Sequence, residues 1–79
     1  MAAGFTRKQG QYLAYIAAYT KVHRQAPAEW EIQQYFGVTP PSVHDMILRL
    51  EALGLISREP WQPRSIRVLV APEALPPLE

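Results

Sequence analysis

The 79-residue sequence contains no cysteine, which excludes a disulfide framework and any metal site built on thiolates. It has no apolar run near the roughly 20 residues that cross a bilayer, and its first residues do not form a signal peptide. We therefore expect a cytoplasmic protein with no membrane partner. Only two histidines are present, without the spacing of a metal site, so we expect no metal and no other cofactor.

The net charge is also small, because eight lysines and arginines and seven acidic residues give a formal net charge of +1. Residues 1–70 hold all eight basic residues and five of the acids, a balance of 8 − 5 = +3, whereas residues 71–79 hold two acids. A charge of +3 is only mildly basic for a nucleic-acid binder. Affinity for DNA would therefore depend on where a few cations lie.

Two helices are predicted in the first half of the chain. Thr6 and Gln9 have the spacing of a capping box. Over residues 7–23 apolar side chains then recur at helical spacing: Tyr12, Leu13, Ile16, Tyr19 and Val22. After Pro27 a second helix is predicted over 28–36, with four apolar positions: Trp30, Ile32, Tyr35 and Phe36. Gly37 is expected to end that helix.

The segment that follows predicts a third helix over about 40–53. Thr39 is a good N-cap, and Pro40 suits the first helical position, which needs no amide donor. The buried stripe is expected to contain five residues: Val43, Met46, Ile47, Leu50 and Leu53. Short polar side chains occupy the other face near the N-terminus, as in a helix that reads the major groove.

After Gly54 the apolar period changes to that of strands, and a hairpin is predicted with its turn at 60–63. Its strands are expected over 55–59 and 65–70. An isolated hairpin is marginal, so an apolar face should pack on the helices: Ile66, Val68 and Val70, or the alternate register. We favour packing of Trp61 beneath this hairpin over stacking on a sugar at its tip.

These elements predict one domain over residues 1–70, mostly α-helical with a small β-hairpin. The order helix, helix, turn, helix, hairpin is that of a winged helix-turn-helix, with three helices plus wing. The tail 71–79 is proline-rich and has no apolar period. We expect it to be mobile or loosely docked.

Several short segments carry a family resemblance over roughly residues 5–69. They are Phe5-Thr6-Arg7-Lys8-Gln9, Pro27, Glu31-Ile32, Gly37, Thr39-Pro40-Pro41, Gly54-Leu55-Ile56 and Arg64-Ser65-Ile66-Arg67. In this order they resemble the N-terminal DNA-binding domain of the LexA repressor family. The resemblance implies sequence-specific binding of double-stranded DNA by a repressor-like transcriptional regulator. The recognition helix, about 40–53, would enter the major groove, and the wing, about 55–70, would lie on the backbone.

The resemblance also implies which positions contact bases: Thr39, Pro41, Ser42, His44 and Asp45. The chain departs from the family at three positions. Pro41 stands where an amide side chain is usual, His44 replaces an acidic residue, and Leu53 replaces a basic residue. The operator should therefore differ. The family's self-cleaving peptidase domain does not lie within these 79 residues, so we expect no enzymatic activity and no small-molecule substrate.

The chemistry of the side chains agrees with this surface. Ser42 can donate or accept, His44 can donate to a guanine, and Asp45 can accept from a cytosine amino group. Five basic residues are candidates for backbone contacts: Lys8, Arg49, Arg58, Arg64 and Arg67. Arg64, at the turn, is the best candidate in the wing. Each could instead be an ordinary solvated or edge-strand charge.

An alternative function is a winged-helix module for protein–protein interaction or dimerisation without nucleic acid. The near-neutral charge, Pro41, Leu48 and the two tryptophans favour it. One DNA-binding module buries only about 600–1,000 Å², so a homodimer or another protein is a further expected partner. Binding to random duplex that weakens steeply as salt rises would separate the two functions.

Overall fold

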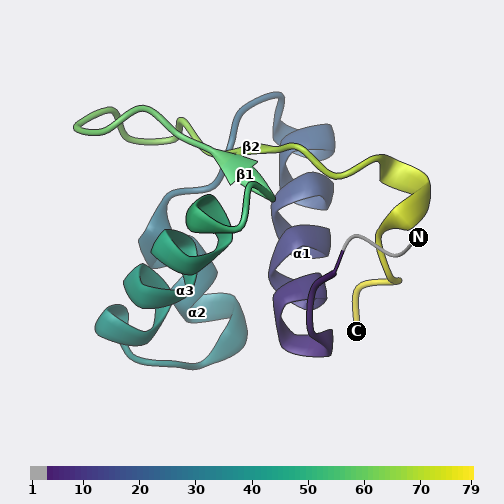
Figure 1. Ribbon diagram of the computed structural model, residues 1–79. Helices are drawn as coiled ribbons and strands as arrows, with labels where there is room; N and C mark the ends of the chain where they lie inside the picture. The colour runs from purple at the N-terminus through teal and green to yellow at the C-terminus, as the bar shows by residue number, and fades with distance from the viewer. Residues whose placement is uncertain (1–3) are drawn as a thin grey trace.

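Three helices and a two-stranded antiparallel sheet form the chain, which a computed structural model describes from residue 4 to residue 79 (Figure 1). The elements are α1 (Arg7–His23), α2 (Glu29–Phe36), α3 (Pro40–Ala52), β1 (Ile56–Ser57), β2 (Arg67–Val68) and the short 3₁₀ helix η1 (Pro72–Ala74). The predicted helices are confirmed to within one residue at each end. The fold is a winged helix-turn-helix, as the element order predicts.

The helix ends are set by local hydrogen bonds. In α1 the backbone amide of Gln9 donates to Thr6 Oγ1 over 3.1 Å, and the Thr6 amide donates to Gln9 Oε1 over 2.9 Å, which completes the predicted capping box. Thr39 accepts from the Ser42 amide at the start of α3. Gly37 ends α2 with a left-handed φ of 65°, which glycine adopts without steric cost.

The core lies where the three helices and the sheet meet. It is made of apolar side chains that are almost fully buried, among them Tyr12, Leu13, Ile16, Ile32, Val43, Ile47, Leu50 and Ile56. The ring of Tyr12 stacks on that of Phe36 at a centroid distance of 4.3 Å, which joins α1 to α2. The predicted apolar face of the hairpin is confirmed, because Ile66 is buried and Val68 and Val70 pack against the same core.

Four residues assigned to apolar positions of the helices are instead exposed: Val22, Trp30, Tyr35 and Leu53. With 3.6 residues per turn, Val22 lies nine residues after Leu13 and therefore on the opposite side of α1. Trp30 lies two residues before Ile32, again on the far side of its helix. Leu53 follows the last residue of α3 and caps it rather than continuing its buried face.

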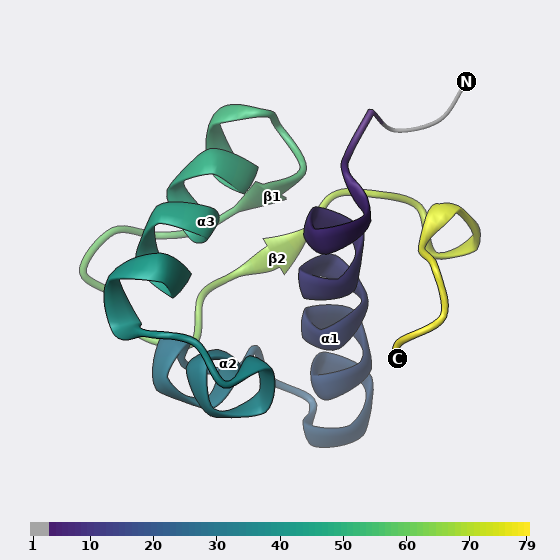
Figure 2. The same cartoon turned by 90° about the horizontal axis from the view of Figure 1, so that it is seen from below.

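The sheet is shorter than predicted. Only two residues pair on each strand, Ile56 with Val68 and Ser57 with Arg67. One more backbone bond, from the Leu69 amide to the Leu55 carbonyl at 2.9 Å, continues this pairing. Beyond Ser57 the chain leaves the ladder and forms the wing loop, residues 58–66, which projects on the side of α3 and away from α1 in both views (Figure 1 and Figure 2).

Trp61 does not pack beneath the hairpin, so that prediction is wrong. Its side chain is 100% exposed, and its φ of 67° is left-handed. The amide of Gln62 donates to the Glu59 carbonyl over 3.1 Å, which closes a tight turn around Pro60 and Trp61. This turn directs the indole into solvent rather than back onto the helices.

The tail 71–79 lies along α1, on the side away from α3 (Figure 2). Gln11 donates through Nε2 to the Pro77 carbonyl at 2.9 Å and accepts from the Glu79 amide at 2.8 Å. Tyr35 donates its hydroxyl to the Glu79 carbonyl, and Arg7 pairs with the Glu79 carboxylate. The tail is therefore docked in this structure, while its mobility stays a prediction.

Gly10 explains how the two ends of the chain approach α1 so closely. A Cβ added at Gly10 would lie 2.9 Å from the Phe5 ring and 3.0 Å from Pro76. Only glycine leaves room for both, because it has no Cβ. Gly10 lowers the helix propensity of α1, but it allows both terminal segments to pack on this helix.

Candidate nucleic-acid interface

The exposed face of α3 carries all five predicted base-contacting residues. Thr39, Pro41, Ser42, His44 and Asp45 are exposed, whereas Val43 and Ile47 from the same turns are buried. This division follows from helical periodicity, because the apolar stripe fixes which side of α3 meets the core. The N-terminal half of α3 thus presents short polar side chains to solvent.

Two of these side chains are joined to each other. Thr39 Oγ1 lies 2.9 Å from Ser42 Oγ and also accepts from the Ser42 amide. Each hydroxyl has one proton, and one of the two protons occupies the bond between them. One hydroxyl proton and the remaining lone pairs are therefore left for a base or a phosphate.

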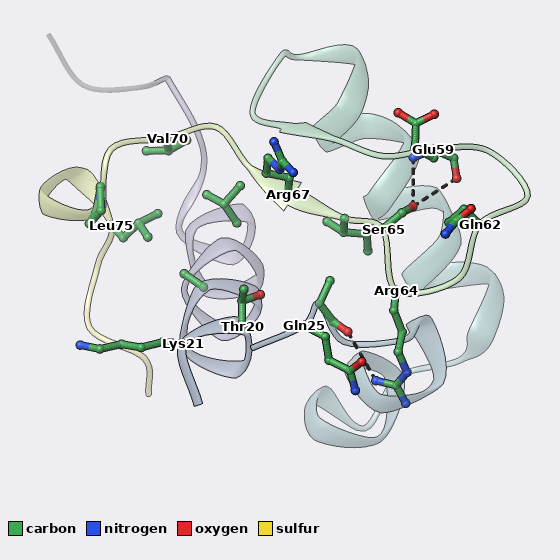
Figure 3. Close-up of a pocket in the computed structure, with 15 residues that line it drawn as sticks. Thr20, Lys21, Gln25, Glu59, Gln62, Arg64, Ser65, Arg67, Val70 and Leu75 are labelled. Atoms are coloured by element: carbon green, nitrogen blue, oxygen red, sulfur yellow. Dashed lines mark hydrogen bonds between the residues drawn. The ribbon is translucent and has the colours of Figure 1, made fainter. Parts of the chain in front are cut away.

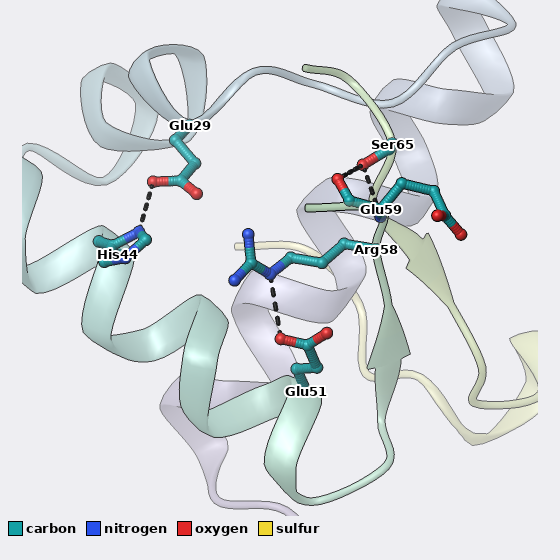
Figure 4. A network of polar contacts seen from close by, with 6 residues as sticks. All are labelled: Glu29, His44, Glu51, Arg58, Glu59 and Ser65. Carbon is teal, nitrogen blue, oxygen red and sulfur yellow. Dashed lines mark hydrogen bonds and ion pairs between the residues drawn. The ribbon is translucent and has the colours of Figure 1, made fainter. Parts of the chain in front are cut away.

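His44 is held by a residue from the preceding helix. Its Nδ1 lies 3.2 Å from Oε1 of Glu29, in the first turn of α2 (Figure 4). Within residues 4–79 the other ring nitrogen, Nε2, has no hydrogen-bond partner. The contact orients the imidazole of this half-exposed side chain and leaves its second nitrogen available for a base contact.

Two basic candidates flank this face. Lys8 from α1 and Arg49 from α3 line a shallow depression together with Ser42 and Asp45. Neither cation makes an ion pair within the part of the chain that the structure describes, and Arg67 on β2 is likewise unpaired and exposed there. The structure thus brings four predicted site residues from two helices onto one surface.

Arg58 turns toward the end of α3 rather than outward. Its Nε donates to Glu51 Oε1 over 3.0 Å, and its side chain is 21% exposed (Figure 4). This ion pair fastens the first residue of the wing loop to α3. The two terminal guanidinium nitrogens of Arg58 take no part in that hydrogen bond.

Arg64 is turned further inward than the sequence predicts. One of its terminal nitrogens, Nη1, donates to Glu31 Oε1 over 2.7 Å, to the Tyr19 hydroxyl over 3.0 Å and to the Ala26 carbonyl over 3.4 Å. Figure 3 shows the side chain extending from the wing toward the α1–α2 connection. Arg64 itself has a left-handed φ of 57°. It links the wing to both preceding helices.

Glu31 is the common acceptor in this cluster. It takes hydrogen bonds from the Tyr19 hydroxyl at 2.7 Å and from the Ala28 amide at 2.8 Å, in addition to Arg64. The Tyr19 hydroxyl, then the Ala28 amide and Arg64, hold the pKa of Glu31 below its ordinary value. The hydrogen bonds to Tyr19 and Glu31 raise the pKa of Arg64. We call Tyr19, Glu31 and Arg64 the wing staple.

The sequence does not single out Tyr19 and Glu31 as partners of Arg64. Glu31 follows Ala28 by three residues, which signals a helix cap, but Arg64 lies 33 residues further along the chain. The available signal is general: a tyrosine on the buried side of a helix requires a partner for its hydroxyl. That signal does not identify the partner.

Other kinds of site find no support in residues 4–79. No group of three histidine, cysteine, aspartate or glutamate side chains is placed there to hold a metal ion. No helix of that part is long and apolar enough to cross a membrane.

Comparison with known proteins identifies relatives of this fold. Residues 2–65 match the family described as the LexA DNA binding domain. The LexA repressor of Thermosipho africanus is 33% identical over 70 residues, which cover 89% of this chain and 35% of that protein. Those of Exiguobacterium sibiricum and Bacillus subtilis are 38% and 37% identical, over 82% and 81% of this chain and 32% of each relative. The chain spans about a third of the length of these curated relatives.

Proposed function

The chain belongs to the LexA DNA-binding domain family, and we propose that it binds DNA sequence-specifically and represses transcription by placing α3 in the major groove of an operator. The observation that carries this proposal is the surface shared by α3 and α1. Exposed polar residues of α3 lie beside two unpaired cations there, and the wing loop projects on the same side.

Base contacts are proposed for the first two turns of α3. Ser42 offers a hydroxyl, and Asp45 offers a carboxylate that accepts from cytosine. Because His44 Nδ1 donates to the Glu29 carboxylate, Nε2 accepts in the neutral ring and donates to a guanine only in the protonated ring. Thr39 and Pro41 lie at the start of the helix, where the backbone comes closest to the groove. Pro41 brings only apolar contact, so base selection should depend on the other side chains.

Backbone contacts are proposed for Lys8, Arg49 and Arg67, which have no internal acid among residues 4–79. Arg58 and Arg64 would reach phosphate only with the nitrogens that Glu51 and Glu31 leave free. Three phosphate contacts predict a slope of about −2.7 for the logarithm of the binding constant against that of salt, since each contributes about −0.9. A fourfold rise in salt should then weaken binding about 40-fold.

We propose that useful affinity requires two copies of the domain. One module buries about 600–1,000 Å² on DNA, at the low end for specific complexes. Two copies on half-sites about 34–36 Å apart would present two recognition helices to one face of the duplex. An operator with two related half-sites at that spacing is the expected result of a binding-site selection.

The test is selection from random duplex DNA, followed by titration of the selected duplex at several salt concentrations. Ser42→Ala should change the base preference at one position, whereas Lys8→Ala should weaken all sequences and lower the slope by about 0.9. Lys21→Ala is the matched control, because Lys21 extends toward the tail on the other side of α1 (Figure 3). Failure to bind at about 50 mM salt would overturn DNA binding and favour the protein-docking alternative.

A further inference from the structure

The tip of the wing loop, residues 59–63, is poorly suited to an ionic contact with DNA. It contains one acid, Glu59, and no basic residue. The two arginines that flank it are paired with Glu51 and Glu31. If this tip contacts DNA, the contact cannot come mainly from charge.

The base of the same loop is held at several points. Ser65 Oγ accepts from the Glu59 amide over 2.9 Å and donates to the Glu59 carbonyl over 3.1 Å, which joins the two sides of the loop (Figure 4). Arg58 is tied to α3, and the wing staple ties Arg64 to α1 and α2. The wing loop is thus held in place by side-chain hydrogen bonds, although the two strands at its base pair over only two residues each.

The wing loop exposes one large apolar side chain to solvent. Trp61 is the only fully exposed member among the large apolar residues that lie on the surface of residues 4–79. Its left-handed φ of 67° is unusual for a bulky residue and needs surrounding structure to maintain it. The loop that carries Trp61 projects on the side of α3 in both views, which is the side of the proposed DNA face (Figure 1 and Figure 2).

We propose that Trp61 contacts the sugars of the minor groove beside the major groove occupied by α3, and that Arg64 positions it there through the wing staple. This inference rests on the proposed function. An indole packs its apolar face on a deoxyribose and donates through Nε1 to a nearby oxygen. Neither contact releases a counterion, so Trp61 contributes affinity that salt does not screen.

The first experiment compares Trp61→Ala with Lys8→Ala on a duplex obtained by selection from random DNA. Trp61→Ala should weaken binding at least about fivefold, about 1 kcal/mol, the low end for an aromatic that packs on nucleic acid. Its salt slope should equal that of the unmodified chain, whereas Lys8→Ala should lower the slope. Unchanged affinity in Trp61→Ala, with normal DNA binding otherwise, would overturn the contact.

Fluorescence observes the contact directly, because the chain has only two tryptophans. In Trp30→Phe the only tryptophan emission comes from Trp61, and addition of the selected duplex should quench or shift it when excitation is selective for tryptophan over the four tyrosines. Binding without any change in this emission would contradict the proposal. No binding at all would instead count against the proposed function, so the two failures are distinguishable.

The positioning role of Arg64 is tested by a double-mutant cycle. If Arg64 acts through Trp61, Arg64→Ala should lose about as much affinity as Trp61→Ala, and the double variant should lose little more. The salt slope should again stay constant. A slope lowered by about 0.9, or losses that simply add, would mean that Arg64 binds phosphate itself.

Tyr19→Phe provides a milder variant that keeps every charge and the aromatic ring. It removes one hydroxyl from the wing staple and leaves Arg64 closer to free. A positioning role predicts weaker DNA binding, with a smaller loss than in Arg64→Ala. Equal or tighter binding would overturn this role, since a released Arg64 would then be serving as a phosphate ligand.

Discussion

Glu31→Ala should cause a large loss of stability for the substitution of one partly buried polar residue, because one carboxylate joins three parts of the fold. It accepts from the Tyr19 hydroxyl in α1, from the Ala28 amide at the start of α2 and from Arg64 in the wing. Alanine removes all three bonds and leaves Arg64 without its acid. No other element replaces that acceptor within residues 4–79.

The magnitude follows from the individual contacts. Loss of a helix cap costs about 1 kcal/mol, and a hydrogen bond to a charged group is worth about 1.5–3 kcal/mol. The side chains of Arg64 and Glu31 are 30% and 17% exposed, so water restores part of the lost interaction. We therefore expect a loss of about 2–3 kcal/mol, which lowers the Tm of a domain this size by roughly 10–20 °C.

Thermal and urea unfolding, followed by circular dichroism, measure this loss. Gln34→Ala is the control, because Gln34 is an exposed residue of the same helix, and it should change stability by less than about 0.5 kcal/mol. Glu31→Gln should fall between the two, since an amide oxygen still caps α2 but carries no charge. If Glu31→Ala were as stable as Gln34→Ala, the wing staple would contribute nothing to the fold.

Three other outcomes follow, from the Glu31 contacts and from the packing of the two terminal segments on α1. The folded-state pKa of Glu31 lies below its ordinary value of 4.5. The carboxylate therefore contributes fully to stability above pH 4.5, and this contribution is lost as pH falls through the folded-state pKa. The free energy of unfolding of Glu31→Gln, measured in urea, should depend less on pH in this acid range. Gly10→Ala should lower the Tm despite the helix propensity gained, and should lower it less in a Phe5→Ala background, where the ring 2.9 Å from the new methyl is gone but Pro76 still lies 3.0 Å from it. Gln11→Ala should speed hydrogen exchange at the Glu79 amide, which donates to Gln11, without changing exchange in the core.

The helices could be predicted from the sequence because their determinants are local. The capping box of Thr6 and Gln9 and the N-cap Thr39 each involve residues three apart, and periodicity places the apolar stripes. Errors occur at stripe ends such as Val22, because successive steps of three residues turn the side chain away from the core face of the helix. A short apolar spacing therefore does not by itself show that two residues share a face.

The wing could not be predicted to the same degree, since its conformation depends on distant partners. Nothing near Arg64 in the sequence indicates that it reaches Glu31, and nothing near Trp61 indicates a left-handed backbone that turns the indole outward. The docked tail has the same origin, because Gln11 and Glu79 are 68 residues apart. For the interface, the exposed face of α3 was predictable, whereas the hold of Glu29 on His44 was not.

These distant contacts change what the charge of the chain implies for DNA binding. Three of the eight basic side chains, Arg7, Arg58 and Arg64, are neutralised by acids of the same chain. Counted from the sequence, the wing has three cations, but only Arg67 is left unpaired there by residues 4–79. A domain with so few free cations near α3 binds random DNA weakly, because non-specific affinity comes from phosphate neutralisation. Contacts that salt does not screen, from α3 and from Trp61, must then supply a larger share of the affinity. The domain would therefore distinguish one DNA site from another by base sequence and groove shape more than by phosphate charge.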